Sequence, residues 1–158
     1  MKARIDLTRG NPQVFQRLLA VQSLVDGSGL DSKLLHLMMM RASQINGCAY
    51  SLDMHSKDAR AENETEQRLY GLSAWRETPF YSDRERAALE WTEAVTLVAS
   101  TGIPDAAFEA VRAQFSEDEI RTLTLAVAMI NTWNRLNIAF RTVPGDYKPG
   151  MFKAAKQA

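Results

Sequence analysis

The chain has 158 residues, of which 46% are apolar, and its 19 basic residues balance its 19 acidic ones. This length and composition predict a single globular domain over residues 1–158, large enough to bury its own core. The balanced charge argues against nucleic-acid and membrane partners, which favour basic patches. The one cysteine excludes an intramolecular disulfide and is typical of a reducing compartment. Because residues 1–13 lack the apolar core of a signal peptide and no run reaches the roughly 18 apolar residues of a membrane span, we expect a cytoplasmic protein.

Helical periodicity runs along the chain, and capping signals divide it into helices. Asn11 is typical of an N-cap with Pro12 at the first helical position, and Asn63 is a candidate cap for a short helix. Capping boxes of the form Ser-x-x-Glu stand at 82–85 and 116–119. These signals predict an all-α bundle of about six to seven helices. The expected ranges are 12–25, 31–46, from 48 into the charged stretch 57–66, 63–75, 82–100, 104–114 and 123–140.

The last predicted helix differs between its two halves. It is apolar almost without a break from Leu123 to Ile130, so we expect it at the centre of the bundle. Its second half, residues 131–137, carries three asparagines and Arg135. We interpret this half as a hydrogen-bonded polar seam at a helix or subunit interface; the alternative is a set of donors to a ligand. Both interpretations require an acidic partner for Arg135 if it is buried.

The reactive side chains concentrate in residues 34–61, which hold both histidines and the only cysteine. Gly47 can adopt the left-handed conformation that closes a helix, and a new helix from Cys48 would direct unpaired N–H groups at the thiol. Such a position lowers the pKa of a thiol and favours the nucleophilic thiolate. Cys48, Ser51 and His55 are spaced i, i+3, i+7, which predicts a nucleophile and a base on one face. The alternative is that Cys48 is a small core residue and His55 a structural histidine.

His36 lies among apolar residues on the preceding helix, where desolvation would favour the neutral imidazole that a general base requires. Zinc is another use of the two histidines and the thiolate, because three ligands leave a fourth position open. We expect no metal and no other cofactor, since the neighbouring carboxylates of Asp53 and Asp58 are predicted to project to other faces. A serine triad on Ser51 and His55 is disfavoured because no acidic residue is placed to orient the imidazole.

The run from Arg41 to Arg60, RASQINGCAYSLDMHSKDAR, resembles the signature of the carboxymuconolactone decarboxylase family, in its alkylhydroperoxidase AhpD-like branch. The family pattern is Glu, eleven residues, Cys, two residues, Cys, three residues, His. The resemblance implies an AhpD-like helical bundle and a homo-oligomer. It gives Cys48 the place of the first, resolving cysteine and His55 the place of the relay histidine, and it matches Tyr50 beside them.

Two positions depart from that pattern. Ser51 stands where the second, peroxide-attacking cysteine belongs, and His36 stands where the relay glutamate belongs. A serine hydroxyl cannot become a sulfenic acid or close a disulfide with Cys48, so the two-thiol peroxidase cycle is unavailable. Three origins are open for the replacements: an engineered variant of an AhpD-like scaffold, a natural paralogue that lost the site, and a Cys-to-Ser substitution made to block oxidation.

Three functions follow from these residues. The first is an AhpD-like antioxidant protein whose peroxidase activity on hydroperoxides is weak or lost. The second is a thiol hydrolase, in which Cys48 attacks an activated ester, His36 or His55 takes its proton, and helix N–H groups with Ser51 or Tyr50 stabilise the oxyanion. The third is a non-catalytic oligomeric scaffold. For the two enzymes we expect a small-molecule substrate.

Overall fold

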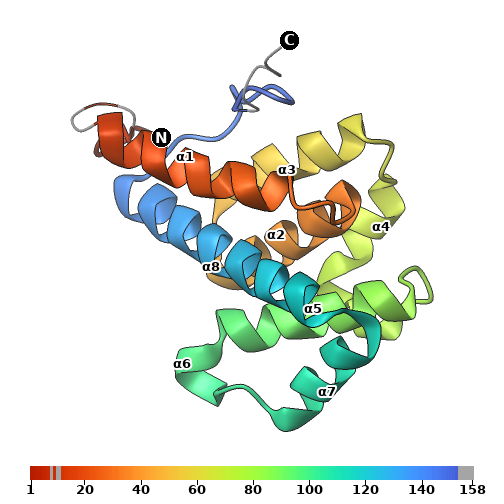
Figure 1. Ribbon diagram of the computed structural model, residues 1–158. Helices are drawn as coiled ribbons and strands as arrows, with labels where there is room; N and C mark the ends of the chain where they lie inside the picture. The colour runs from red at the N-terminus through yellow and green to blue at the C-terminus, as the bar shows by residue number, and fades with distance from the viewer. Residues whose placement is uncertain (8, 10–11, 153–158) are drawn as a thin grey trace.

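The computed structural model describes residues 1–7, 9 and 12–152, and it confirms the all-helical prediction over them (Figure 1). Eight α-helices and one 3₁₀ helix occur in this part of the chain. Two of the predicted helices are each divided into two in the structure, which accounts for the larger number. The helices are α1 Pro12–Asp26, α2 Ser32–Asn46, α3 Ala49–Ala61, α4 Glu66–Gly71, the 3₁₀ helix η1 Leu72–Glu77, α5 Asp83–Thr96, α6 Val98–Thr101, α7 Asp105–Gln114 and α8 Glu117–Phe140.

Helices α2 and α8 form the centre of the bundle, as predicted for the last helix. Helix α2 packs against α3, α5 and α8, while α8 also packs against α1 (Figure 1). The main core lies between these helices, and a second cluster lies between α2 and the α4–η1 segment. Each fully buried Leu or Met contributes roughly 1.5–3 kcal/mol of transfer free energy. The buried apolar residues of α2 are Leu34, Leu35, Leu37, Met38, Met39, Met40 and Ala42.

The turn between α2 and α3 has the conformation that the glycine predicts. Gly47 has φ 71° and ψ 32°, the left-handed region in which a side chain would be strained. The following amide, that of Cys48, donates to the Ser43 carbonyl at 3.0 Å and completes the helix end. Cys48 itself is the N-cap of α3, with an extended backbone at φ −89° and ψ 94°. The turn therefore places the thiol at the start of a new helix.

Three predicted helix boundaries were wrong, and one lies outside the described residues. Asn63 does not cap α4; it takes the left-handed φ of 65°, and Thr65 accepts the capping hydrogen bond from the Arg68 amide. The last helix begins at Glu117 because the Ser116 capping box starts it directly. The predicted helix 82–100 ends at Thr96, and the separate α6 follows it. The predicted N-cap at Asn11 lies outside the described residues.

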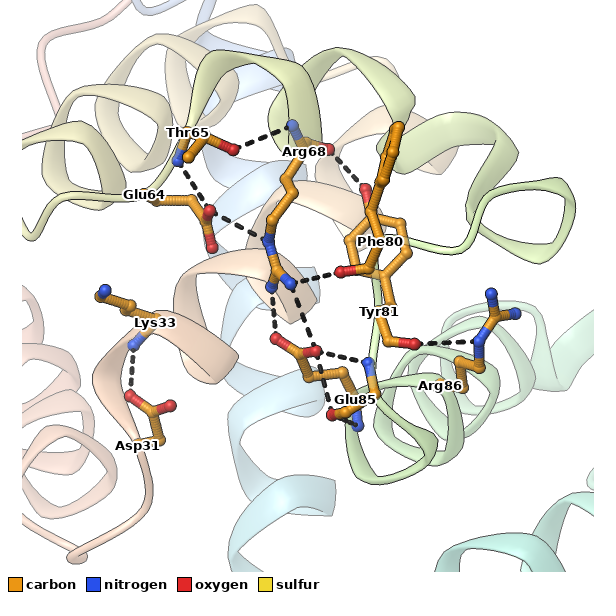
Figure 2. A network of polar contacts seen from close by, with 10 residues as sticks. Asp31, Lys33, Glu64, Thr65, Arg68, Phe80, Tyr81, Glu85 and Arg86 are labelled. Carbon is orange, nitrogen blue, oxygen red and sulfur yellow. Dashed lines mark hydrogen bonds and ion pairs between the residues drawn. The ribbon is translucent and has the colours of Figure 1, made fainter.

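A polar network joins the start of α4 to the start of α5 (Figure 2). The Arg68 guanidinium pairs with Glu85 of α5, and its Nε lies 3.0 Å from Oε1 of Glu64. It also donates to the Phe80 carbonyl, while the Tyr81 hydroxyl donates to the carbonyl of Arg68. Glu64 is only 7% exposed, so the arginine compensates a buried carboxylate. This network holds the α4–η1 segment against the bundle.

The second half of α8 is a polar seam, as we interpreted it, except for Arg135. The three asparagines of the seam are buried, whereas Arg135 is exposed and needs no acidic partner. Its guanidinium donates within its own helix, to the carbonyl of Asn131 at 3.0 Å and to its side-chain oxygen at 2.8 Å.

The segment after α8 returns over α1 and α3 (Figure 1). None of the helices in the described part of the chain combines the length and the apolar composition of a membrane span.

Candidate functional site

The thiol of Cys48 is buried at the start of α3. The residue is 1% exposed, and its Sγ donates a hydrogen bond to the Ser51 hydroxyl at 3.2 Å. Ser51, also 1% exposed, lies in the first turn of the helix. The predicted pairing of positions 48 and 51 is therefore present. A hydroxyl occupies the position, one turn into the helix, where the family pattern has a second thiol.

Asn134 of α8 holds this serine in place. Its Nδ2 donates to the Ser51 hydroxyl at 3.1 Å and to the Ser43 hydroxyl of α2 at 3.1 Å. Its side-chain oxygen accepts from Asn46 Nδ2 at 3.0 Å, and the residue is fully buried. Asn134 thus joins α2, α3 and α8 around the thiol. The sequence indicated a polar seam there but not this contact, although an asparagine after an apolar half-helix was the signal that pointed to it. We call Cys48, Ser51 and Asn134 the thiol cluster.

The two histidines lie together, on facing helices. The ring centroids of His36 on α2 and His55 on α3 are 5.6 Å apart, with an angle of 43° between the rings. Burial, followed by the electrostatic effect of the neighbouring His36, lowers the pKa of His55 from 6.5 to about 3. His55 is therefore neutral at pH 7, the state that a base or a metal ligand requires. His36 Nε2 lies 3.7 Å from Oε1 of Glu62 at the end of α3.

Among the described residues, neither histidine forms a hydrogen bond with the thiol, so the expected nucleophile and base are not in direct contact. The thiol of Cys48 is bonded to Ser51. The backbone at Cys48 gives the reason. Cys48 is an extended N-cap and not a helical residue, so the i, i+7 spacing does not place it on the same helical face as His55. The predicted residues therefore divide into two groups, one near the start of α3 and one a turn further along it, where His55 faces His36 of α2.

Asp58 belongs to the second group, and its predicted orientation was wrong. One oxygen of Asp58 and one nitrogen from each of the two histidines lie within 4.8 Å of one another. Asp58 is 6% exposed, and its carboxylate accepts from the Tyr147 hydroxyl at 2.8 Å and from the Gly150 amide at 3.2 Å. The i, i+3 spacing from His55 was the signal that could have found it. Asp53, by contrast, points elsewhere as predicted, because it pairs with Lys57 at 2.9 Å. We call His36, His55 and Asp58 the histidine cluster.

A cavity of about 1150 Å³ opens beside the histidine cluster. The three residues of the cluster line it, together with Tyr50, whereas Cys48 and Ser51 are not among its lining residues. Burial, followed by the charge of Asp53, raises the pKa of Tyr50, so its phenol stays protonated and can donate. The volume suits a small-molecule ligand. The apolar wall comes from α1, α2, α8 and the C-terminal segment, and includes Phe15, Leu19, Leu35, Met39, Trp133 and Phe152.

The comparison with known proteins identifies related chains along most of this length. Residues 12–94 match the carboxymuconolactone decarboxylase family. The uncharacterized protein YdfG of Bacillus subtilis (strain 168) is 39% identical over 139 residues, which cover 88% of this chain and 95% of YdfG. The uncharacterized protein YnjA of Escherichia coli (strain K12) is 30% identical over 112 residues, or 71% of this chain and 61% of YnjA.

A solved structure has the same fold. It is a protein of unknown function from Agrobacterium tumefaciens, whose name associates it with the antioxidant defence protein AhpD. The two chains are 44% identical and superpose with a TM-score of 0.89, over 92% of this chain and 100% of the other. The helical bundle described above is therefore an AhpD-like fold.

Proposed function

The chain belongs to the carboxymuconolactone decarboxylase family, in its AhpD-like branch, and from that premise we propose that it is a one-thiol member in which two-thiol peroxidase turnover is weak or lost. The observation that carries the proposal is the contact between Cys48 Sγ and Ser51 Oγ at 3.2 Å. A disulfide requires a second sulfur at this position, and Cys48 is the only cysteine of the chain.

The chemistry that remains to Cys48 is stoichiometric unless another thiol assists. Its thiolate can attack a hydroperoxide, so that a sulfur–oxygen bond forms, the oxygen–oxygen bond breaks and the alcohol leaves. The product is a sulfenic acid. A second thiolate must then displace its oxygen as water to give a disulfide, and within one chain that thiolate is lacking. Turnover therefore depends on a thiol supplied from outside, which must reach a residue that is 1% exposed.

The hydrolase alternative has less support from the contacts. A thiol hydrolase needs a base within hydrogen-bond reach of its nucleophile, and the Cys48 thiol is bonded to Ser51 instead. The neutral His55, which lines the cavity, is compatible with acid–base chemistry. It belongs to the histidine cluster, however, and not to the thiol cluster. Ester hydrolysis by Cys48 would require the thiol to leave its serine partner.

The test restores the second thiol. We expect Ser51→Cys to form an intrachain disulfide with peroxide and to sustain peroxide consumption with a dithiol reductant, while the parent consumes no more than one equivalent before it stalls. Ser51→Ala is the matched control, because it removes the hydroxyl without supplying sulfur, and it should stay as inactive as the parent. The double variant with His36→Glu, which completes the family pattern, should turn over faster than Ser51→Cys alone.

Two results would contradict the proposal. One is a parent protein that consumes peroxide for many turnovers with the dithiol at the rate of Ser51→Cys. The other is a Ser51→Cys protein whose two thiols are both titrated by Ellman's reagent after peroxide treatment, since a disulfide removes both. A burst of product from an activated ester, lost in Cys48→Ala, would favour the hydrolase instead.

A further inference from the structure

We propose that the histidine cluster, His36, His55 and Asp58, binds a divalent first-row transition-metal ion such as zinc, with open coordination positions that face the cavity. Each residue offers one ligand atom, and these atoms lie within 4.8 Å of one another. Two imidazoles and one carboxylate form a donor set that suits zinc or non-haem iron and leaves room for a water or a substrate. Cys48 is not part of this set, so the inference stands apart from the proposed function.

Among the described residues, no cationic side chain compensates the carboxylate of Asp58. It is 6% exposed, and its described partners are the Tyr147 hydroxyl and the Gly150 amide, both neutral. In the described part of the chain, no Lys or Arg side chain forms an ion pair with it. A buried carboxylate without a cation is costly, and a divalent ion would supply the charge. The hydroxyl and the amide would then orient the ligand, as the partners of metal-bound carboxylates do.

Each imidazole has one ring nitrogen that is unpaired in the described part of the chain. Nδ1 of His36 and Nδ1 of His55 are both buried, and neither has a hydrogen-bond partner among the described residues. A buried ring nitrogen without a partner is unfavourable for folding, and coordination would use its lone pair. His36 Nε2, which faces Glu62 Oε1 at 3.7 Å, has the kind of carboxylate neighbour that fixes the orientation of metal-binding histidines.

The separation of the ligand atoms sets the movement that binding requires. Metal–ligand bonds of about 2.0–2.2 Å place tetrahedral ligand atoms about 3.3–3.6 Å apart. The three side chains must therefore close by up to about 1.5 Å around the ion, which small rotations about their χ angles provide. Because all three line the cavity, the remaining positions of the ion are accessible to a small molecule. A bound ion would act there as a Lewis acid.

The experiment titrates cobalt(II) and zinc(II) into the full-length protein after treatment with EDTA. Cobalt is followed by its visible absorption and zinc by calorimetry. We expect one ion per chain, and Asp58→Asn and His55→Gln should each weaken the affinity at least about 100-fold, whereas Tyr147→Phe, which only loosens the orientation of Asp58, should weaken it about 10-fold. Asp53→Asn is the matched control, because this carboxylate lies on the same helix but pairs with Lys57.

A parent protein that binds neither ion overturns the proposal. So does binding that Asp58→Asn and His55→Gln leave undiminished, and so does cobalt absorption that Cys48→Ala abolishes, since the thiol would then be a ligand. The circular dichroism spectrum of each variant checks its fold. Should either ligand variant fail to fold, the decision rests on the rise in melting temperature with zinc, which Tyr147→Phe should reduce and Asp53→Asn should not. None of these measurements depends on peroxide turnover.

Discussion

Replacing Asn134 by alanine should destabilise the bundle strongly, because the residue makes three side-chain hydrogen bonds in a fully buried position. Its amide donates to Ser43 and Ser51 at 3.1 Å, and its oxygen accepts from Asn46 at 3.0 Å. Each such bond contributes about 1 kcal/mol net, and its loss leaves a buried partner unpaired. We therefore expect the free energy of unfolding to fall by about 3 kcal/mol and the melting temperature to fall by roughly 6–12 °C.

Urea unfolding at fixed protein concentration measures this loss, and alkylation of the thiol by iodoacetamide gives a second measurement. Without Asn134 the Ser51 hydroxyl loses one of its two partners, so Cys48 should become easier to alkylate. Thr132→Ala is the control, because Thr132 lies on the same helix and its one hydroxyl bond among the described residues is to the Ala128 carbonyl. A loss below about 1 kcal/mol for Asn134→Ala would show that the neighbouring hydroxyls find other partners, and that Asn134 does not hold α2, α3 and α8 together.

Two further perturbations test the buried charges. The pKa of His55 is 6.5 in the unfolded chain and about 3 in the folded one, so between these pH values the unfolded state binds a proton that the folded state does not. The free energy of unfolding therefore falls as the pH falls through this window, by up to about 1.4 kcal/mol per pH unit. Urea titrations with EDTA between pH 6 and pH 4 should show a steeper slope in the parent than in His55→Gln, and equal slopes would refute it. Arg68→Met should cost about 3 kcal/mol in the same assay because it leaves Glu64 buried without its cation, whereas Arg121→Ala, which removes an exposed ion pair, should leave the stability close to that of the parent. A loss for Arg68→Met no larger than that of the control would mean that water reaches Glu64.

The helices could be predicted from the sequence because their boundaries are set by local contacts. The capping boxes at Ser82 and Ser116 and the left-handed Gly47 depend only on residues within one turn, and all three are found in the structure. Asn63 misled the prediction for an equally local reason. Asparagine suits an N-cap and also tolerates a positive φ, and at this position the chain leaves α3 in the left-handed conformation.

The site was predicted less well because it depends on where one helix begins and on what packs against it. The spacing of Cys48 and His55 implies a shared face only if both residues are helical, and an extended N-cap is not. Asp58 was assigned to another face, yet the hydroxyl of Tyr147, which lies 89 residues away in sequence, binds its carboxylate beside the histidines. The cavity likewise depends on the return of the C-terminal segment over α3, which periodicity does not report.

The two departures from the family pattern fall in different buried groups, and this division explains why each has its own consequence. Ser51 lies in the thiol cluster, where its hydroxyl keeps the hydrogen bonds to Cys48 and Asn134 but removes the sulfur that a disulfide needs. His36 lies in the histidine cluster, where the family pattern has a glutamate and this chain has an imidazole beside His55. Asp58 is then the one acidic residue of that cluster. No hydrogen bond joins the two clusters among the described residues, so a change at position 51 acts directly on the sulfur chemistry. A change at position 36 alters the charge of the cavity wall.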